Sequence, residues 1–173
     1  MKIIIKYFIL ILVLFSENIS AQEIDKNIFI IYQKVMRFIR EPNVKYQVAT
    51  KTNKYMFDGF DFTNPSGLGV DSNKIWERTE WKGFLTTIDT GGIVDYGLNS
   101  NGERWFKSPA KRIKNYTNLE FAPVIISKEG DKAISLLTKY SRVSNSGSSM
   151  AFFLEKENGN WKMKYVHTYS FFD

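Results

Sequence analysis

The sequence has 173 residues, of which 43% are hydrophobic, 24% charged and 16% aromatic, and its formal net charge is +6. This is the balance of one globular domain with a large share of ring side chains. The chain contains no cysteine and a single histidine, His167, which excludes disulfides, thiolate metal sites, a cysteine nucleophile and a cluster of imidazole ligands within one chain. No cofactor is predicted.

Residues 1–21 are predicted to form a secretory signal peptide. Lys2 and Lys6 precede an apolar run at 7–15, and a polar segment then ends in Ser20-Ala21 before a plausible cleavage point. The run is shorter than the roughly 20 apolar residues that a membrane-spanning helix needs, so a permanent membrane anchor is the weaker interpretation. We therefore expect one exported domain at residues 22–173, in the periplasm or outside the cell.

The mature chain is predicted to begin with an amphipathic helix. Apolar residues recur there at spacings of three and four and form one face: Ile24, Ile28, Ile31, Tyr32, Val35, Met36 and Ile39. Pro42 ends this helix near residue 40 or 41.

The next part of the chain is predicted in less detail. Segments 44–50 and 54–57 are expected to be two short strands. Residues 59–73 carry one proline and several glycines and indicate a loop. The pattern of 73–87 suits a helix by its spacing and a strand by its content of β-branched residues, and both alternatives stay open.

The second half is predicted to contain most of the sheet. A strand at 93–98 turns through 99–102 into a short partner at 104–106, and a short helix follows at 109–116, because Ser-Pro at its start supplies an N-cap and a first-turn proline. Four strands follow, at 119–127, 132–144, 149–157 and 161–172. Their short, turn-forming connections are typical of antiparallel neighbours.

This order resembles the NTF2-like superfamily, also described as a cystatin-like cone. The resemblance rests on Gly-Leu-Asn-Ser-Asn-Gly-Glu-Arg-Trp at 97–105 and on Gly-Asn-Trp-Lys-Met at 159–163; it covers the first helix and residues 74–172, while residues 42–73 depart from the pattern. It implies an α+β fold in which N-terminal helices pack on a curved antiparallel sheet, forming a cone whose open end often holds an apolar ligand. Members include isomerases, dehydratases and non-catalytic binding modules, so the fold does not select a function.

The last strand carries the predicted pocket. Because strand side chains alternate between two faces, one face is expected to hold Trp161, Met163, Tyr165, His167, Tyr169 and Phe171. One interpretation makes His167 a ligand-orienting or proton-transferring group at the floor of the cone. The alternative makes it a core residue that bonds a tyrosine or a backbone carbonyl. Residues predicted to touch a ligand are Trp161, Tyr165, His167, Tyr169, Tyr140 and Tyr96.

An enzyme of this kind would need a carboxylate as general base. Asp95 is the candidate, although its alternation with Val94 and Tyr96 favours an outward position. The spacing of the ionisable residues identifies no acid–base pair, so His167 and Asp95 are candidates and catalysis is not predicted.

A basic segment is a candidate for binding anions or a partner. It contains Arg104, Lys107, Lys111 and Arg112, interleaved with aromatic residues. The alternative is the solvated side of a short helix. In an exported protein, nucleic acid is not the expected partner.

Three functions remain open from the sequence. The first is an exported binding module that holds a small apolar molecule in a pocket or docks an envelope or secreted protein on its sheet. The second is an isomerase, dehydratase or hydrolase that uses His167. The third is an immunity-type protein that binds an exported partner. The sequence does not predict the oligomeric state.

Overall fold

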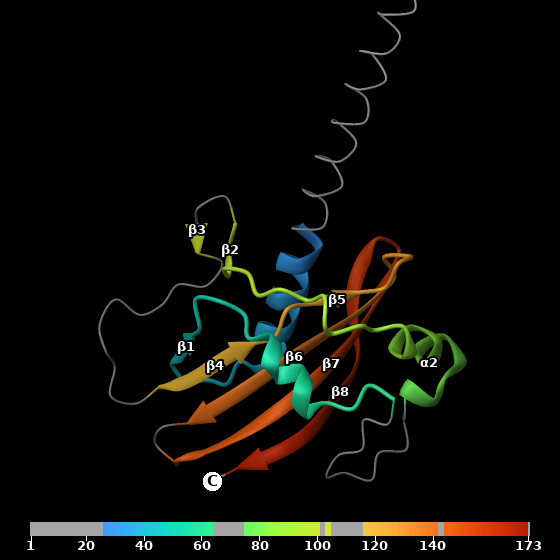
Figure 1. Ribbon diagram of the computed structural model, residues 1–173. Coiled ribbons are helices and arrows are strands. Elements are labelled where there is room, and N and C mark those ends of the chain that lie inside the picture. The colour runs from blue at the N-terminus through green and yellow to red at the C-terminus, as the bar shows by residue number, and fades with distance from the viewer. Residues whose placement is uncertain (1–25, 64–74, 101–102, 105–115, 142–143, 173) are drawn as a thin grey trace, which may run out of the picture.

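A computed structural model describes residues 26–63, 75–100, 103–104, 116–141 and 144–172 (Figure 1). The expected signal peptide and nearly all of the expected 109–116 helix lie outside these ranges. Within them the chain forms a sheet with few helices, so the α+β class is confirmed.

The N-terminal helix spans residues 26–39 in the described part of the chain. Its predicted apolar face is the buried one, with Ile31, Tyr32 and Val35 fully buried and Ile28 and Ile39 less than one-tenth exposed. The helix ends at the predicted place because proline is disfavoured beyond the first turn of a helix.

The main sheet is built largely from the second half of the chain. Its strands are β1 (Tyr46–Val48), β4 (Thr117–Phe121), β5 (Ile125–Ile126), β6 (Lys132–Ser141), β7 (Ser146–Glu157) and β8 (Asn160–Phe172). The strand order is β1-β4-β6-β7-β8, with β5 also paired to β6. Pairing is antiparallel except between β1 and β4, which confirms the predicted meander.

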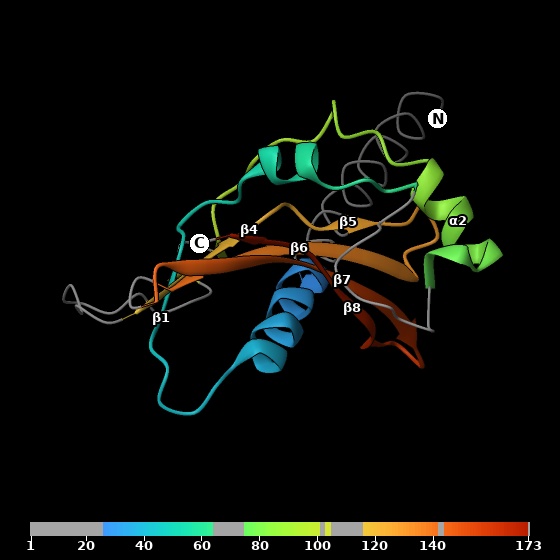
Figure 2. The same ribbon diagram turned by 90° about the horizontal axis from the view of Figure 1, so that it is seen from below.

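Both faces of this sheet are covered, which makes a three-layer arrangement (Figure 2). The N-terminal helix packs on one face. The other face is covered by the 3-10 helices η1 (Lys54–Gly59) and η2 (Ile75–Glu77), by α2 (Thr79–Thr86) and by the chain around them. Residues 133–137 and 151–154 are consequently fully buried without alternation, as expected for strands packed on both sides.

Three expectations for the residues before β4 need correction or completion. The strand expected at 54–57 is wrong, since these residues belong to η1. The open choice at 73–87 is decided in favour of helix by η2 and α2. The strand expected at 93–98 is also wrong, because its pairing there is one isolated bridge, and the hairpin consists of β2 (Asn99–Ser100) and β3 (Glu103–Arg104).

The break between β4 and β5 is held by two tyrosines. Tyr32 Oη donates to the carbonyl of Ala122 at 2.8 Å, and Val124 N donates to Tyr96 Oη at 3.0 Å. The two hydroxyl oxygens lie 2.8 Å apart. Because the hydroxyl hydrogen of Tyr32 is donated to the Ala122 carbonyl, Tyr96 is the donor in the hydrogen bond between the two hydroxyls. Burial and the nearby Tyr96 raise the pKa of Tyr32 above its ordinary value, which keeps it protonated. The two tyrosines thus satisfy the Ala122 carbonyl and the Val124 amide, the backbone groups on either side of Pro123.

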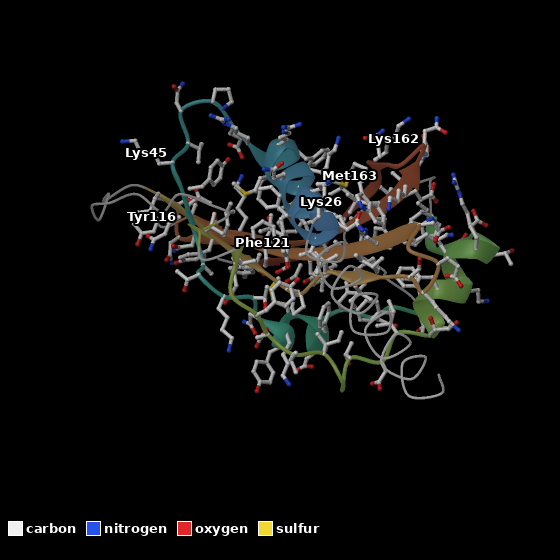
Figure 3. All side chains as sticks on the ribbon, turned by 90° about the horizontal axis from the view of Figure 1, so that it is seen from above. Lys26, Lys45, Tyr116, Phe121, Lys162 and Met163 are labelled. Atoms are coloured by element: carbon white, nitrogen blue, oxygen red, sulfur yellow. The ribbon has the colours of Figure 1, made fainter. Side chains whose placement is uncertain are left out.

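Two irregularities in β8 overturn the prediction of a single aromatic face. The β7–β8 register shifts so that Lys164 and Tyr169 have no opposite residue, and each extra residue inverts the alternation beyond it. Trp161 and Met163 therefore pack with the N-terminal helix, whereas Tyr165 packs on the opposite face. Figure 3 shows Met163 on the side of β8 that faces this helix.

Candidate ligand-binding groove

A groove of about 840 Å³ lies between α2 and β5. On one side α2 and the residues after it contribute Thr79, Glu80, Gly83, Phe84, Thr87, Ile88, Asp89 and Ile93. On the other side β5 and its flanks contribute Val124, Ile125, Ile126, Lys128, Glu129 and Lys132. Among the described lining residues, the apolar side chains of both segments are half-buried, whereas four of the five charged ones are exposed and form the rim of the groove.

The helix α2 is held in place by its opposite side. Trp81 is fully buried, its Nε1 donates to Glu155 Oε1 at 2.7 Å, and its ring packs edge-to-face on Phe153 with centroids 5.3 Å apart. Leu85, one turn later, is also buried. This anchoring leaves Gly83 toward the groove, where an added Cβ would meet no heavy atom within 4 Å.

The other wall is the edge of a strand rather than a face of the sheet. In a strand, successive side chains point to opposite faces, yet the consecutive residues Val124, Ile125 and Ile126 all line the groove. Val124 and Ile126 pack against the core on the N-terminal helix side and Ile125 against the other core. The groove therefore runs along the backbone of β5.

The charges at the rim are uneven. Carboxylates are supplied by Glu80, Asp89 and Glu129, and ammonium groups by Lys128 and Lys132. Lys132 Nζ bonds Asp131 Oδ2 at 2.8 Å. This contact lowers the pKa of the Asp131 carboxyl and raises that of Lys132. One of the two ammonium groups, that of Lys132, is therefore already paired with a carboxylate of a neighbouring residue.

The predicted pocket residues of β8 lie elsewhere. His167 is 5% exposed and stacks on Tyr165 with ring centroids 6.2 Å apart. Tyr169 packs against Phe60 at 5.0 Å, and burial raises the pKa of its hydroxyl while a hydrogen bond with Ser149 opposes the rise. These side chains belong to the layer between the sheet and η1.

The other aromatic candidates are also separated from one another. Trp161 lies under the N-terminal helix, where its Nε1 donates to Asn27 Oδ1 at 3.0 Å. Tyr140 stacks on Phe172 at the far end of the sheet. Tyr96 lies next to the groove, because its hydroxyl accepts the Val124 amide.

Asp95, the candidate general base, ties two segments together. Its Oδ1 accepts from Thr52 Oγ1 at 3.1 Å and from Lys54 N at 2.7 Å. The carboxylate thus serves the first residue of η1, and its hydrogen bonds are those of a structural side chain. The catalytic roles of Asp95 and His167 stay hypotheses.

The basic segment is almost entirely outside the described residues. Arg104 is part of β3, whereas Lys107, Lys111 and Arg112 lie in 105–115. The anion or partner patch predicted there stays a prediction.

The groove residues are not among those that the sequence predicts to line a pocket. Phe84, Ile88 and Ile93 were assigned to an ambiguous segment and to a strand, and Ile125 and Ile126 to the interior of one long strand. Pro123 was an available signal, because proline within a sheet marks an edge or an irregularity. The pairing of these two distant segments has no local signature.

The described ranges contain no group of three or more side chains that could together hold a metal ion. Among their helices, none combines the length and the apolar character that crossing a bilayer requires.

The chain was also compared with known proteins. No protein-family description, curated protein sequence or solved structure matches it.

Proposed function

We propose that the protein is an exported binding module whose groove between α2 and β5 holds a mainly apolar ligand. The observation that carries this proposal is the combination of a volume of about 840 Å³ with a lining of half-buried apolar side chains and mostly exposed charged ones. Ligand pockets in proteins commonly measure about 300–1,000 Å³ and combine apolar side chains with a small number of polar groups. The partner classes remain those expected from the sequence, a small apolar molecule or an apolar part of an envelope or secreted protein.

Catalysis is not part of the proposal. His167 and Asp95 are absent from the groove lining, and the hydrogen bonds of Asp95 go to the backbone and side chain of its structural neighbours. A binding role needs no acid–base pair and uses the features that the groove has.

The groove can be filled by substitution at one position. Gly83 lies on α2 with open space at its Cβ, so Gly83→Phe should fold and place a ring in the groove. Gly83→Ala is the matched control, because it removes the same glycine and adds only a methyl group. The probe is N-phenyl-1-naphthylamine, an uncharged apolar fluorophore, titrated into residues 22–173.

We expect the probe to bind the wild type and Gly83→Ala alike, and Gly83→Phe at least about tenfold more weakly, a loss of roughly 1.4 kcal/mol. Methyl resonances of Ile88 and Val124 should shift on binding. Equal affinity of all three proteins, or no binding at all, would reject the groove as the ligand site.

Export is tested separately. Expression of the full chain in a Gram-negative host should give a periplasmic product that begins at or within two residues of Gln22. A product that keeps residues 1–21 and stays in the cytoplasm would contradict this part of the proposal.

The NTF2-like cone is the architectural part of the proposal. It is supported by a helix that packs on one face of a largely antiparallel meander. An experimental structure with the sheet curved around this helix would support the cone, and a flat sheet would reject it.

A further inference from the structure

The outer edge of β5 is open in the described part of the chain. β4 and β5 both pair with the same side of β6, and β1 covers β4 through Tyr46–Val48 and leaves β5 uncovered. Ile125 pairs with Ile134, and Ser127 N donates to Lys132 O at 2.9 Å. Because inward and outward backbone groups alternate along an antiparallel strand, the N–H and C=O of Ile126 point away from β6, toward the groove.

This edge faces a helix across an apolar floor. The side of α2 with Gly83 and Phe84 lies opposite the edge, and Ile88 and Ile93 continue the floor beyond the helix. A groove between a free strand edge and a helix suits an extended peptide, which adds a strand by backbone hydrogen bonds and places alternate side chains in the apolar floor. A compact apolar molecule would leave the polar edge of Ile126 unused.

The rim charges favour one kind of peptide. Among the described residues, three carboxylates and two lysines border the groove, and one of those lysines is bonded to Asp131. The rim is thus net acidic on a chain whose formal net charge is +6. A partner segment with basic flanks complements this rim and gains from it in affinity and association rate.

We infer that the groove binds an extended peptide segment with apolar residues at alternate positions and lysine or arginine at its flanks, added as a strand to the edge of β5. This inference rests on the proposed function and specifies its ligand. The occupant is a segment of another exported or envelope protein, and it is recognised by backbone pairing, apolar alternation and positive charge.

The test uses synthetic peptides and residues 22–173. The parent peptide is acetyl-Lys-Val-Thr-Val-Thr-Val-Lys-amide, and two twins carry N-methyl groups at its odd or its even backbone nitrogens. A strand added to β5 bonds it through one alternate set of amides, so one twin should lose at least about tenfold in affinity and the other should keep most of it. A peptide with glutamate in place of both lysines should bind more weakly than the parent, and the difference should shrink at high salt.

Peptide binding should also protect the Ile126 amide from hydrogen exchange. Gly83→Phe should abolish peptide binding, whereas Gly83→Ala should not. Equal affinity of both N-methyl twins and the parent would overturn strand addition. Binding of N-phenyl-1-naphthylamine without any peptide binding would overturn this inference and leave the proposed function standing. Failure of the apolar probe and of every peptide would reject both.

Discussion

Replacing Tyr32 by phenylalanine would remove one hydroxyl from the centre of the molecule without changing the packed volume. The hydroxyl donates to the Ala122 carbonyl at 2.8 Å and accepts from Tyr96, and Tyr32 is fully buried. An unsatisfied buried carbonyl costs about 1–3 kcal/mol. We therefore expect Tyr32→Phe to lower the free energy of unfolding by about 2 kcal/mol, which is a fall in melting temperature of roughly 4–8 °C for a domain of this size.

The assay is urea denaturation of residues 22–173, followed by tryptophan fluorescence and circular dichroism. Tyr96→Phe should cost a similar amount, since it leaves the Val124 amide without its acceptor. Because Tyr32 and Tyr96 share one hydrogen bond, the double variant should lose less than the two single losses added together.

Tyr55→Phe is the matched control, because Tyr55 is 69% exposed and its hydroxyl should contribute less than about 0.5 kcal/mol. If Tyr32→Phe is as stable as this control, or if the two core substitutions are strictly additive, the argument that these hydroxyls satisfy the backbone around Pro123 is wrong.

Three further predictions follow from other contacts. Asp95→Ala should destabilise the protein by roughly 1–2 kcal/mol and speed hydrogen exchange at the Lys54 amide; unchanged exchange would show that the carboxylate does not hold η1. Hydrogen bonds from Lys162 and Lys164 hold the pKa of Glu157 at about 2, so the NMR signal of its carboxyl carbon should titrate near pH 2. Any stability that this carboxylate contributes is present above about pH 4.5 and is lost as the pH falls toward 2. Lys162→Ala should move this midpoint upward, and an unmoved midpoint would refute the assigned cause. His167→Gln should cost about 1–3 kcal/mol by thermal denaturation, because the imidazole is buried; an unaltered melting temperature would argue against a structural side chain.

Local signals were sufficient for the elements with strong periodicity. The spacing of Ile28, Ile31, Val35 and Ile39 predicted the N-terminal helix and its buried face, and both are confirmed. The antiparallel strands were predicted from short turns, and those turns contain Gly130, Asn145 and Asn158 at positive φ, a conformation that glycine and asparagine adopt most readily.

The two faces of β8 could not be predicted from its own residues. Alternation assumes a regular ladder, and the irregularities at Lys164 and Tyr169 arise from pairing with β7. Similarly, the segment with Phe84 and Leu85 has the composition of a strand, but Trp81 and Leu85 pack together on the sheet when it is helical. Tertiary packing overrides a weak local preference in both places.

By itself the sequence determined the class of the fold, the first helix and the order of the long strands, because these depend on periodicity and turn chemistry within a few neighbouring residues. The groove was decided by tertiary structure alone. It exists because β1 pairs with β4 alone, which leaves the edge of β5 open in the described part of the chain, and because Trp81 anchors α2 opposite that edge. Residues 79–93 and 124–132 carry no mutual signal, so only folding could bring Gly83 and Ile126 to one site.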